Sequence, residues 1–101
     1  MAITSDFSVD GQELTIFIQG RFDFAAHHEF RDAYERVDVA PKRYLVDLQG
    51  TTYLDSSALG MLLLLRDHAG GDHAQVRLRN CNADVRKILA ISNFEQLFQI
   101  A

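Results

Sequence analysis

The sequence predicts an α/β fold, with a mixed, mostly parallel β-sheet and helices packed on it. Two observations favour this class. Short apolar runs with the period of a strand alternate along the chain with longer runs that have the period of a helix. Only a turn separates the first two strand-like runs, so they form a hairpin, whereas helices separate the later ones. The expected element order is β-β-α-β-α-β-α-β.

The opening hairpin comprises residues 3–9, which alternate in part, and residues 13–19, ELTIFIQ, whose even-numbered positions form an apolar side. Asp10 and Gly11 supply the turn between the two strands. Gly20 is expected to end the second strand.

Three segments have the apolar spacing of helices: residues 24–37, residues 56–69, and a segment that Asn82 or Asp84 opens. Phe24 lies on the apolar side of the first helix, and Asp23 just before it is a suitable N-cap. Three further segments are predicted as strands: residues 43–48, residues 74–79 and a short strand within residues 94–100. Residues 49–52, QGTT, are polar and predict a loop.

The composition is that of one small globular domain, spanning residues 1–101. The chain has 48% hydrophobic and 24% charged residues, and its formal net charge is −4. A basic footprint for nucleic acid is therefore absent from the sequence. Cys81 is the only cysteine, so no intramolecular disulfide is expected, in keeping with a reducing compartment.

The N-terminal residues MAITSDFSVD lack the features of a signal peptide. The longest apolar run, residues 58–65, is much shorter than the roughly 20 residues that span a bilayer. The four consecutive leucines at residues 62–65 cover more than one face of the expected helix, which favours burial of most of them. We expect a cytoplasmic protein without direct membrane insertion.

Residues 54–60, LDSSALG, place an acid and two hydroxyls at the start of the most apolar helix. Aspartate and serine are favoured N-caps, so the segment is compatible with a purely structural role. The same position also suits a serine that is phosphorylated, because the start of a helix carries free N–H groups and partial positive charge. The residues by themselves leave both interpretations open.

A wider pattern resembles the STAS domains, specifically the single-domain bacterial anti-sigma factor antagonists. YLVDLQGTTYLDSSALGMLLLLRDHA is similar to their strand ending in DL, polar loop, D-S-S/T-x-L-G motif and helix. IFIQGRFDFAAHHEFRDAY upstream and LRNCNADVRKILAISNFEQLFQI downstream match the remaining segments in the same order. The resemblance covers nearly the whole chain and is greatest to the HsbA-type antagonists.

The resemblance implies that Ser56 is the phosphorylated residue, with Ser57 as the second choice and Asp55 and Asp23 as acidic neighbours. Ala58 is a departure, because many members have glycine there, and it puts the choice of kinase in doubt. The surface beside Ser56 is expected to contact a partner; its predicted residues are Ser57, Ala58, Met61 and Leu64.

The mechanism implied is partner switching. The unphosphorylated protein binds an anti-sigma factor and the phosphorylated protein releases it, which controls transcription. A serine kinase and a phosphatase, attached to a response regulator in the HsbA-type branch, set the phosphorylation state, with motility and biofilm formation as the output. The alternative is a STAS subunit of a phospholipid-trafficking ABC transporter. A nucleotide-binding STAS domain ranks last, because the sequence has no glycine-rich phosphate loop.

Catalysis is not predicted. The serines do not lie in a G-x-S-x-G motif, and the four histidines are in no recognisable frame with a nucleophile. His68 and His73 have acidic neighbours, which makes a metal conceivable, but their spacing matches no ligand pattern. We therefore expect no enzyme activity, no cofactor and no metal site.

Overall fold

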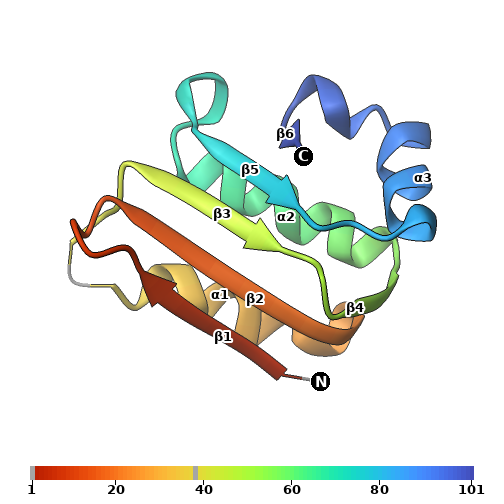
Figure 1. Ribbon diagram of the computed structural model, residues 1–101, viewed down its shortest axis with the longest axis horizontal. Coiled ribbons are helices and arrows are strands. Elements are labelled where there is room, and N and C mark those ends of the chain that lie inside the picture. Colours follow the sequence, from red (N-terminus) through yellow and green to blue (C-terminus); the bar gives the residue numbers. More distant parts are fainter. Residues whose placement is uncertain (1, 38) are drawn as a thin grey trace.

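The computed structural model describes residues 2–37 and 39–101 (Figure 1). The elements follow in this order: β1 (Ala2–Phe7), β2 (Glu13–Phe22), the 3-10 turn η1 (Phe24–Ala26), α1 (His27–Glu35), β3 (Arg43–Asp47), β4 (Thr51–Leu54), α2 (Ser56–His68), η2 (Gly71–His73), β5 (Val76–Arg79), α3 (Ala83–Ile91), η3 (Phe94–Gln96) and β6 (Gln99–Ile100). The predicted α/β class with a mixed, mostly parallel sheet is confirmed.

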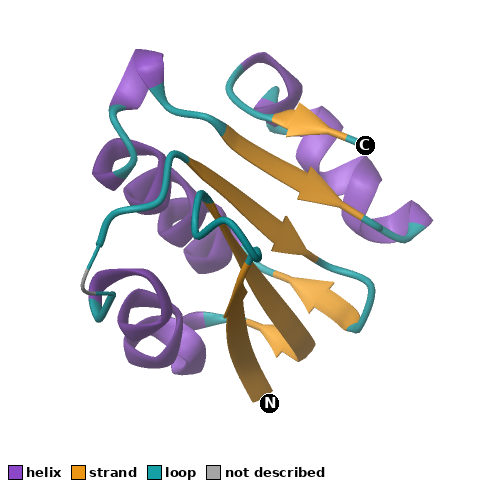
Figure 2. Ribbon diagram, turned by 60° about the vertical axis from the view of Figure 1, so that its left-hand side comes forward, coloured by secondary structure: helices purple, strands orange, loops and turns teal. Residues whose placement is uncertain are grey.

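The sheet has the strand order β1-β2-β3-β5-β6, and β4 pairs with β2 away from this path. β1 runs antiparallel to β2, and every other pairing is parallel. Figure 2 shows α1 and α2 on one side of the sheet. Their buried side chains pack on the inward residues of the central strands, among them Ile16, Val46 and Leu78.

Two predictions about the strands were wrong. Gly20 does not end β2, which continues to Phe22 after a register shift between Gly20 and Arg21. Gly20 has a φ of 87°, a conformation that glycine adopts without strain. The predicted loop at residues 49–52 also contains the start of β4, which pairs with this kinked end of β2. The observed order is therefore β-β-α-β-β-α-β-α-β.

The polar sequence of β4 is compatible with a strand because the hydroxyl of its buried threonine makes a hydrogen bond. Thr51 is 1% exposed, and its hydroxyl donates a hydrogen bond of 2.9 Å to the carbonyl oxygen of Ile18. The Asn82 side chain donates to the Thr51 carbonyl oxygen at 3.1 Å and accepts from the Val85 amide at 2.8 Å. Asn82 is thus the N-cap of α3, the first of the two predicted start residues, and it ties that helix to β4.

The leucine run of α2 is only half buried. Leu62 and Leu65 are in the core, whereas Leu63 and Leu64 are exposed. The C-terminal segment packs through Phe94 and Phe98, whose rings are stacked 5.4 Å apart. Among the helices of the described residues, none is long and apolar enough to cross a membrane.

Leu62→Ala and Leu64→Ala form a matched pair for testing the orientation of α2. Leu62 is 0% exposed and Leu64 is 52% exposed. Leu62→Ala should lower the free energy of unfolding by about 2–5 kcal/mol, because it leaves a cavity in the core. Leu64→Ala should lower it by less than about 0.5 kcal/mol. Urea unfolding measures both changes, and equal losses would contradict this orientation.

Candidate functional site

The LDSS segment forms the junction between β4 and α2. Asp55 has extended backbone angles and is the N-cap of α2, with its carboxylate accepting a hydrogen bond of 2.9 Å from the Ala58 amide. Ser56 is the first helical residue. The structural part of the LDSS interpretation is thus confirmed, and an aspartate rather than a serine performs the capping.

Asp23 occupies the equivalent position on the neighbouring strand. It follows β2 and caps η1, accepting a hydrogen bond of 3.1 Å from the Ala25 amide. The register pairs Phe22 with Leu54, so Asp23 and Asp55 leave adjacent ends of two parallel strands. The Asp55 amide also donates to the carbonyl oxygen of Phe22 at 3.4 Å. The two carboxylates are therefore neighbours, although they lie 32 positions apart in the sequence (23 and 55).

The hydroxyl of Ser56 is exposed and makes no hydrogen bond to another described residue. Ser56 is exposed and Ser57 is half-buried. Among the described residues, neither hydroxyl has a hydrogen-bond partner, because Asp55 already supplies the cap. A modification at Ser56 would therefore break no contact that holds the fold.

An apolar surface lies next to this junction. Phe24 is 71% exposed, and it lines a shallow depression together with Leu64, Gly60 and the half-buried Ser57 and His27. The volume of this depression is about 410 Å³. We call it the Phe24–Leu64 surface. Exposed large apolar side chains that gather in one place are typical of a protein-binding surface.

The structure corrects two of the predicted partner-contact residues. Ala58 is fully buried, so it cannot contact a partner, and Met61, at 4% exposed, forms only the floor of the Phe24–Leu64 surface. Ser57 and Leu64 do line the surface. Phe24 was expected on the apolar side of the first helix, but the 3-10 turn η1 precedes α1, and Phe24 is exposed.

Arg21 and Tyr53 also lie at the junction and were missed at the sequence level. They are paired in the register of β2 and β4. The guanidinium carbon of Arg21 is 4.3 Å from the centroid of the Tyr53 ring, and Arg21 Nε is 3.6 Å from Asp23 Oδ2. Because the sequence predicted neither β4 nor the extension of β2, nothing in it indicated this contact.

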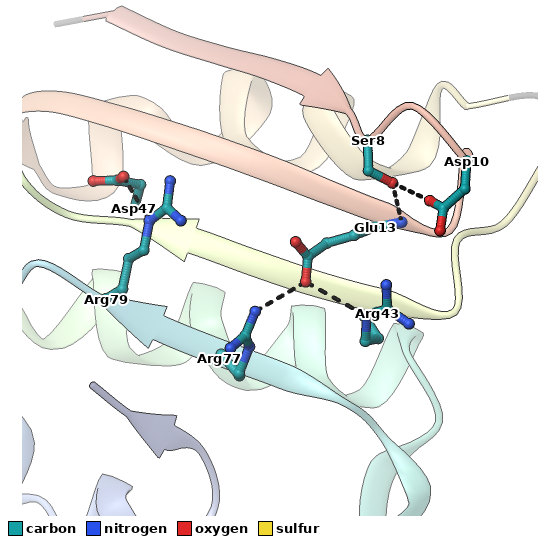
Figure 3. A network of polar contacts seen from close by, with 7 residues as sticks. All are labelled: Ser8, Asp10, Glu13, Arg43, Asp47, Arg77 and Arg79. Carbon is teal, nitrogen blue, oxygen red and sulfur yellow. Dashed lines mark hydrogen bonds and ion pairs between the residues drawn. The ribbon is translucent and has the colours of Figure 1, made fainter.

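A separate polar network crosses the face of the sheet that α1 and α2 leave open (Figure 3). Glu13 on β2 pairs with Arg77 on β5 at 3.1 Å and with Arg43 on β3 at 3.6 Å. Asp47 on β3 pairs with Arg79 on β5 at 2.9 Å. These ion pairs join three adjacent strands, so we assign the network a structural role.

Asp47 is the buried member of the network. Burial alone would raise the pKa of this carboxyl, but the hydrogen bonds that it accepts outweigh burial. Its donors are the Gln49 amide, Arg79 and Asn80. The pKa of Asp47 is therefore below its ordinary value.

The other residues singled out in the sequence form no site. Among the described residues, no group of three or more histidine, cysteine or acidic side chains is placed to hold a metal ion. The His68 ring packs on Tyr34 with centroids 4.9 Å apart. Cys81 is half-buried, and burial raises the pKa of its thiol, which disfavours the reactive thiolate.

These features define a small α/β domain that presents a serine and an apolar surface at one strand–helix junction. The family model described as "Mlab, STAS domain" matches residues 5–99, so the chain belongs to the STAS domain family. A STAS-domain containing protein of Pseudomonas aeruginosa (strain UCBPP-PA14) is 74% identical over 101 residues, and the match covers 100% of both chains.

Two solved structures show how widely this fold is used. The anti-sigma factor antagonist SpoIIAA in its unphosphorylated form is 17% identical, with a TM-score of 0.76, and the match covers 99% of this chain and 87% of SpoIIAA. A sulfate transporter family protein from Wolinella succinogenes is 13% identical, with a TM-score of 0.78, and the match covers 94% of this chain and 79% of that protein. At these identities the similarity concerns the fold, so function must be argued from the site.

Asp47→Asn tests the network on the open face. The pKa of Asp47 is lower in the folded state than in the unfolded state, so its contribution is present above the unfolded value of about 3.9 and is lost as the pH falls through the folded value. At pH 7 the variant should lose about 1–3 kcal/mol of unfolding free energy. The loss should shrink in urea titrations repeated at decreasing pH.

Asp72→Asn is the matched control, because Asp72 is 95% exposed in its ion pair with Arg66. It should change the unfolding free energy by less than about 1 kcal/mol. If the loss for Asp47→Asn is the same at pH 7 and at pH 3, the ionised carboxylate is not what stabilises this part of the sheet.

Proposed function

We propose that this STAS domain is an anti-sigma factor antagonist whose binding is switched by phosphorylation of Ser56. One observation carries the proposal: Ser56 is exposed at the start of α2, its hydroxyl is not used by the fold, and the Phe24–Leu64 surface lies beside it. A partner that covers the apolar surface would also cover the serine. Whether the serine carries a phosphate would then decide whether the partner fits.

The chemistry of the switch is simple. A kinase transfers the γ-phosphoryl group of ATP to Ser56 Oγ, the hydroxyl proton leaves, and ADP is released; a phosphatase hydrolyses the ester. The modification adds about −1.5 to −2 charges at pH 7. Asp23 and Asp55 already place negative charge at the junction, so a partner fitted to a neutral hydroxyl would be repelled.

The fold supports a switch that leaves the domain intact. The Asp55 carboxylate holds the Ala58 amide, and the first turn of α2 does not depend on either serine. Phosphorylation would then change the surface and not the helix. Ser57 is the less suitable acceptor, because it is half-buried in the Phe24–Leu64 surface.

The proposed partners follow from the resemblance of the sequence to the HsbA-type antagonists. The unphosphorylated domain binds an anti-sigma factor in the cytoplasm, and a serine kinase and a phosphatase on a response regulator set its state. The HsbA-type output would be motility and biofilm formation. The domain itself carries out no catalysis.

Ser56→Ala and Ser56→Asp test the switch. Ser56→Asp should weaken binding to the anti-sigma partner at least about tenfold, because it brings a negative charge into the contact. Ser56→Ala should keep the affinity of the wild-type protein. The partner is recovered from lysate of the native host with the three proteins as baits, and affinities are then measured by titration.

Intact-mass analysis of the recovered wild-type protein, with peptide mapping, should find phosphate on Ser56. Ser5→Asp is the matched control, because Ser5 is exposed like Ser56 and lies on β1, outside the junction, so it should not change the affinity. Equal affinities of Ser56→Ala and Ser56→Asp would refute the switch. Co-purification of a membrane ATPase with all three baits would instead support a transporter subunit.

A further inference from the structure

We propose that Arg21 is the residue that receives the phosphate when Ser56 is phosphorylated, and that its movement uncovers the exposed Tyr53 ring beside the modified serine. This inference rests on the proposed function and names the residue that regulates the same site. It is carried by the position of Arg21, by its present contacts and by the charges around Ser56.

Arg21 lies close to Ser56 because of the pairing between β2 and β4. Arg21 is opposite Tyr53, three positions before Ser56. The next residue pair, Phe22 and Leu54, is also in register, and the Asp55 amide contacts the Phe22 carbonyl. The backbone of Arg21 therefore runs beside the segment that leads into Ser56.

The present contacts of Arg21 are weak enough to be exchanged. Its Nε is 3.6 Å from Asp23 Oδ2, which is longer than a hydrogen bond, and its side chain is 65% exposed. Its second contact is the cation–π contact with the Tyr53 ring, at 4.3 Å. Exposed ion pairs and cation–π contacts of this kind contribute little to stability.

A phosphate on Ser56 would compete well for this guanidinium. It would be the third acidic group at the junction, beside Asp23 and Asp55, and it carries more charge than either. Guanidinium groups bind phosphate through two parallel charge-assisted hydrogen bonds. Asp23 would stay satisfied without Arg21, because its other oxygen accepts from the Ala25 amide.

The movement of Arg21 from Tyr53 to the phosphate would change the exposed surface that these two residues form, as well as the charge there. When Arg21 moves to the phosphate, the exposed ring of Tyr53 loses the cation that covers it. Phosphorylation would thus rearrange an arginine and a tyrosine, two residue types that often dominate protein interfaces.

One other titratable side chain lies near the site. His27 lines the Phe24–Leu64 surface together with Ser57, and its ring stacks on Phe24 with centroids 5.9 Å apart. Among the described residues, the charged and titratable groups that we place around the phosphate are Arg21, Tyr53, Asp23, Asp55 and His27. A titration of the phosphate must therefore distinguish the effect of Arg21 on the phosphate pKa from the effect of His27.

The experiment measures the second pKa of the phosphoserine, which is about 6 in the absence of neighbours. Phosphoserine is incorporated at position 56 during synthesis, and the phosphorus-31 NMR signal is followed against pH. Arg21→Ala should raise this pKa by about half a unit, because a neighbouring cation favours the dianion. Arg21→Lys keeps the charge but not the two parallel hydrogen bonds, so it should restore only part of the difference.

Arg36→Ala is the control, because Arg36 is an exposed arginine paired with Asp32 on α1, and it should leave the phosphate pKa unchanged. His27→Ala tests the competing side chain of the Phe24–Leu64 surface, and it should shift the phosphate pKa by less than Arg21→Ala does. An unchanged pKa in Arg21→Ala, or a larger shift in His27→Ala, would overturn the proposal. Because the phosphate is installed directly, this result does not depend on any kinase or partner, whereas the affinities of the Ser56 variants test the switch itself.

Discussion

The junction depends on a short parallel pairing between β4 and the kinked end of β2. Gly20 allows β2 to change register, and the buried Thr51 hydroxyl binds the Ile18 carbonyl at this point. Asn82 holds the same segment from the other side through the Thr51 carbonyl. Without this pairing, the turns that contain Asp23 and Asp55 would leave separate parts of the sheet.

The two capping aspartates hold the helical turns of the junction without help from a serine. Each carboxylate is fixed by a backbone amide at the start of its helical element, so the structural requirement is met before any serine takes part. This leaves the Ser56 hydroxyl exposed on a rigid support. It also places negative charge where a phosphate would add to it, and Arg21 beside it as a counter-charge.

Local sequence patterns predicted the elements whose periodicity is strong. The amphipathic period predicted α1, although Phe24, expected on the apolar side of that helix, lies in the 3-10 turn η1 and is exposed. β4 was missed because it has only four residues and begins with two threonines; the burial of Thr51 depends on a hydrogen bond to the distant Ile18 carbonyl. The orientation of α2 was not predictable, since apolar residues occur on nearly all of its faces. For this reason the sequence assigned Ala58 to the surface, although it lies in the core.

The most direct test of the account is a comparison of two-dimensional ¹H–¹⁵N NMR spectra of the unmodified protein and the protein with phosphoserine at position 56. The account predicts that resonances shift only around the junction, in residues 21–27 and 53–60. The rest of the spectrum should be unchanged, because no contact that holds the fold uses the Ser56 hydroxyl. Shifts that spread through β1, β3 and α3 would contradict it, since they would show that the phosphate remodels the fold.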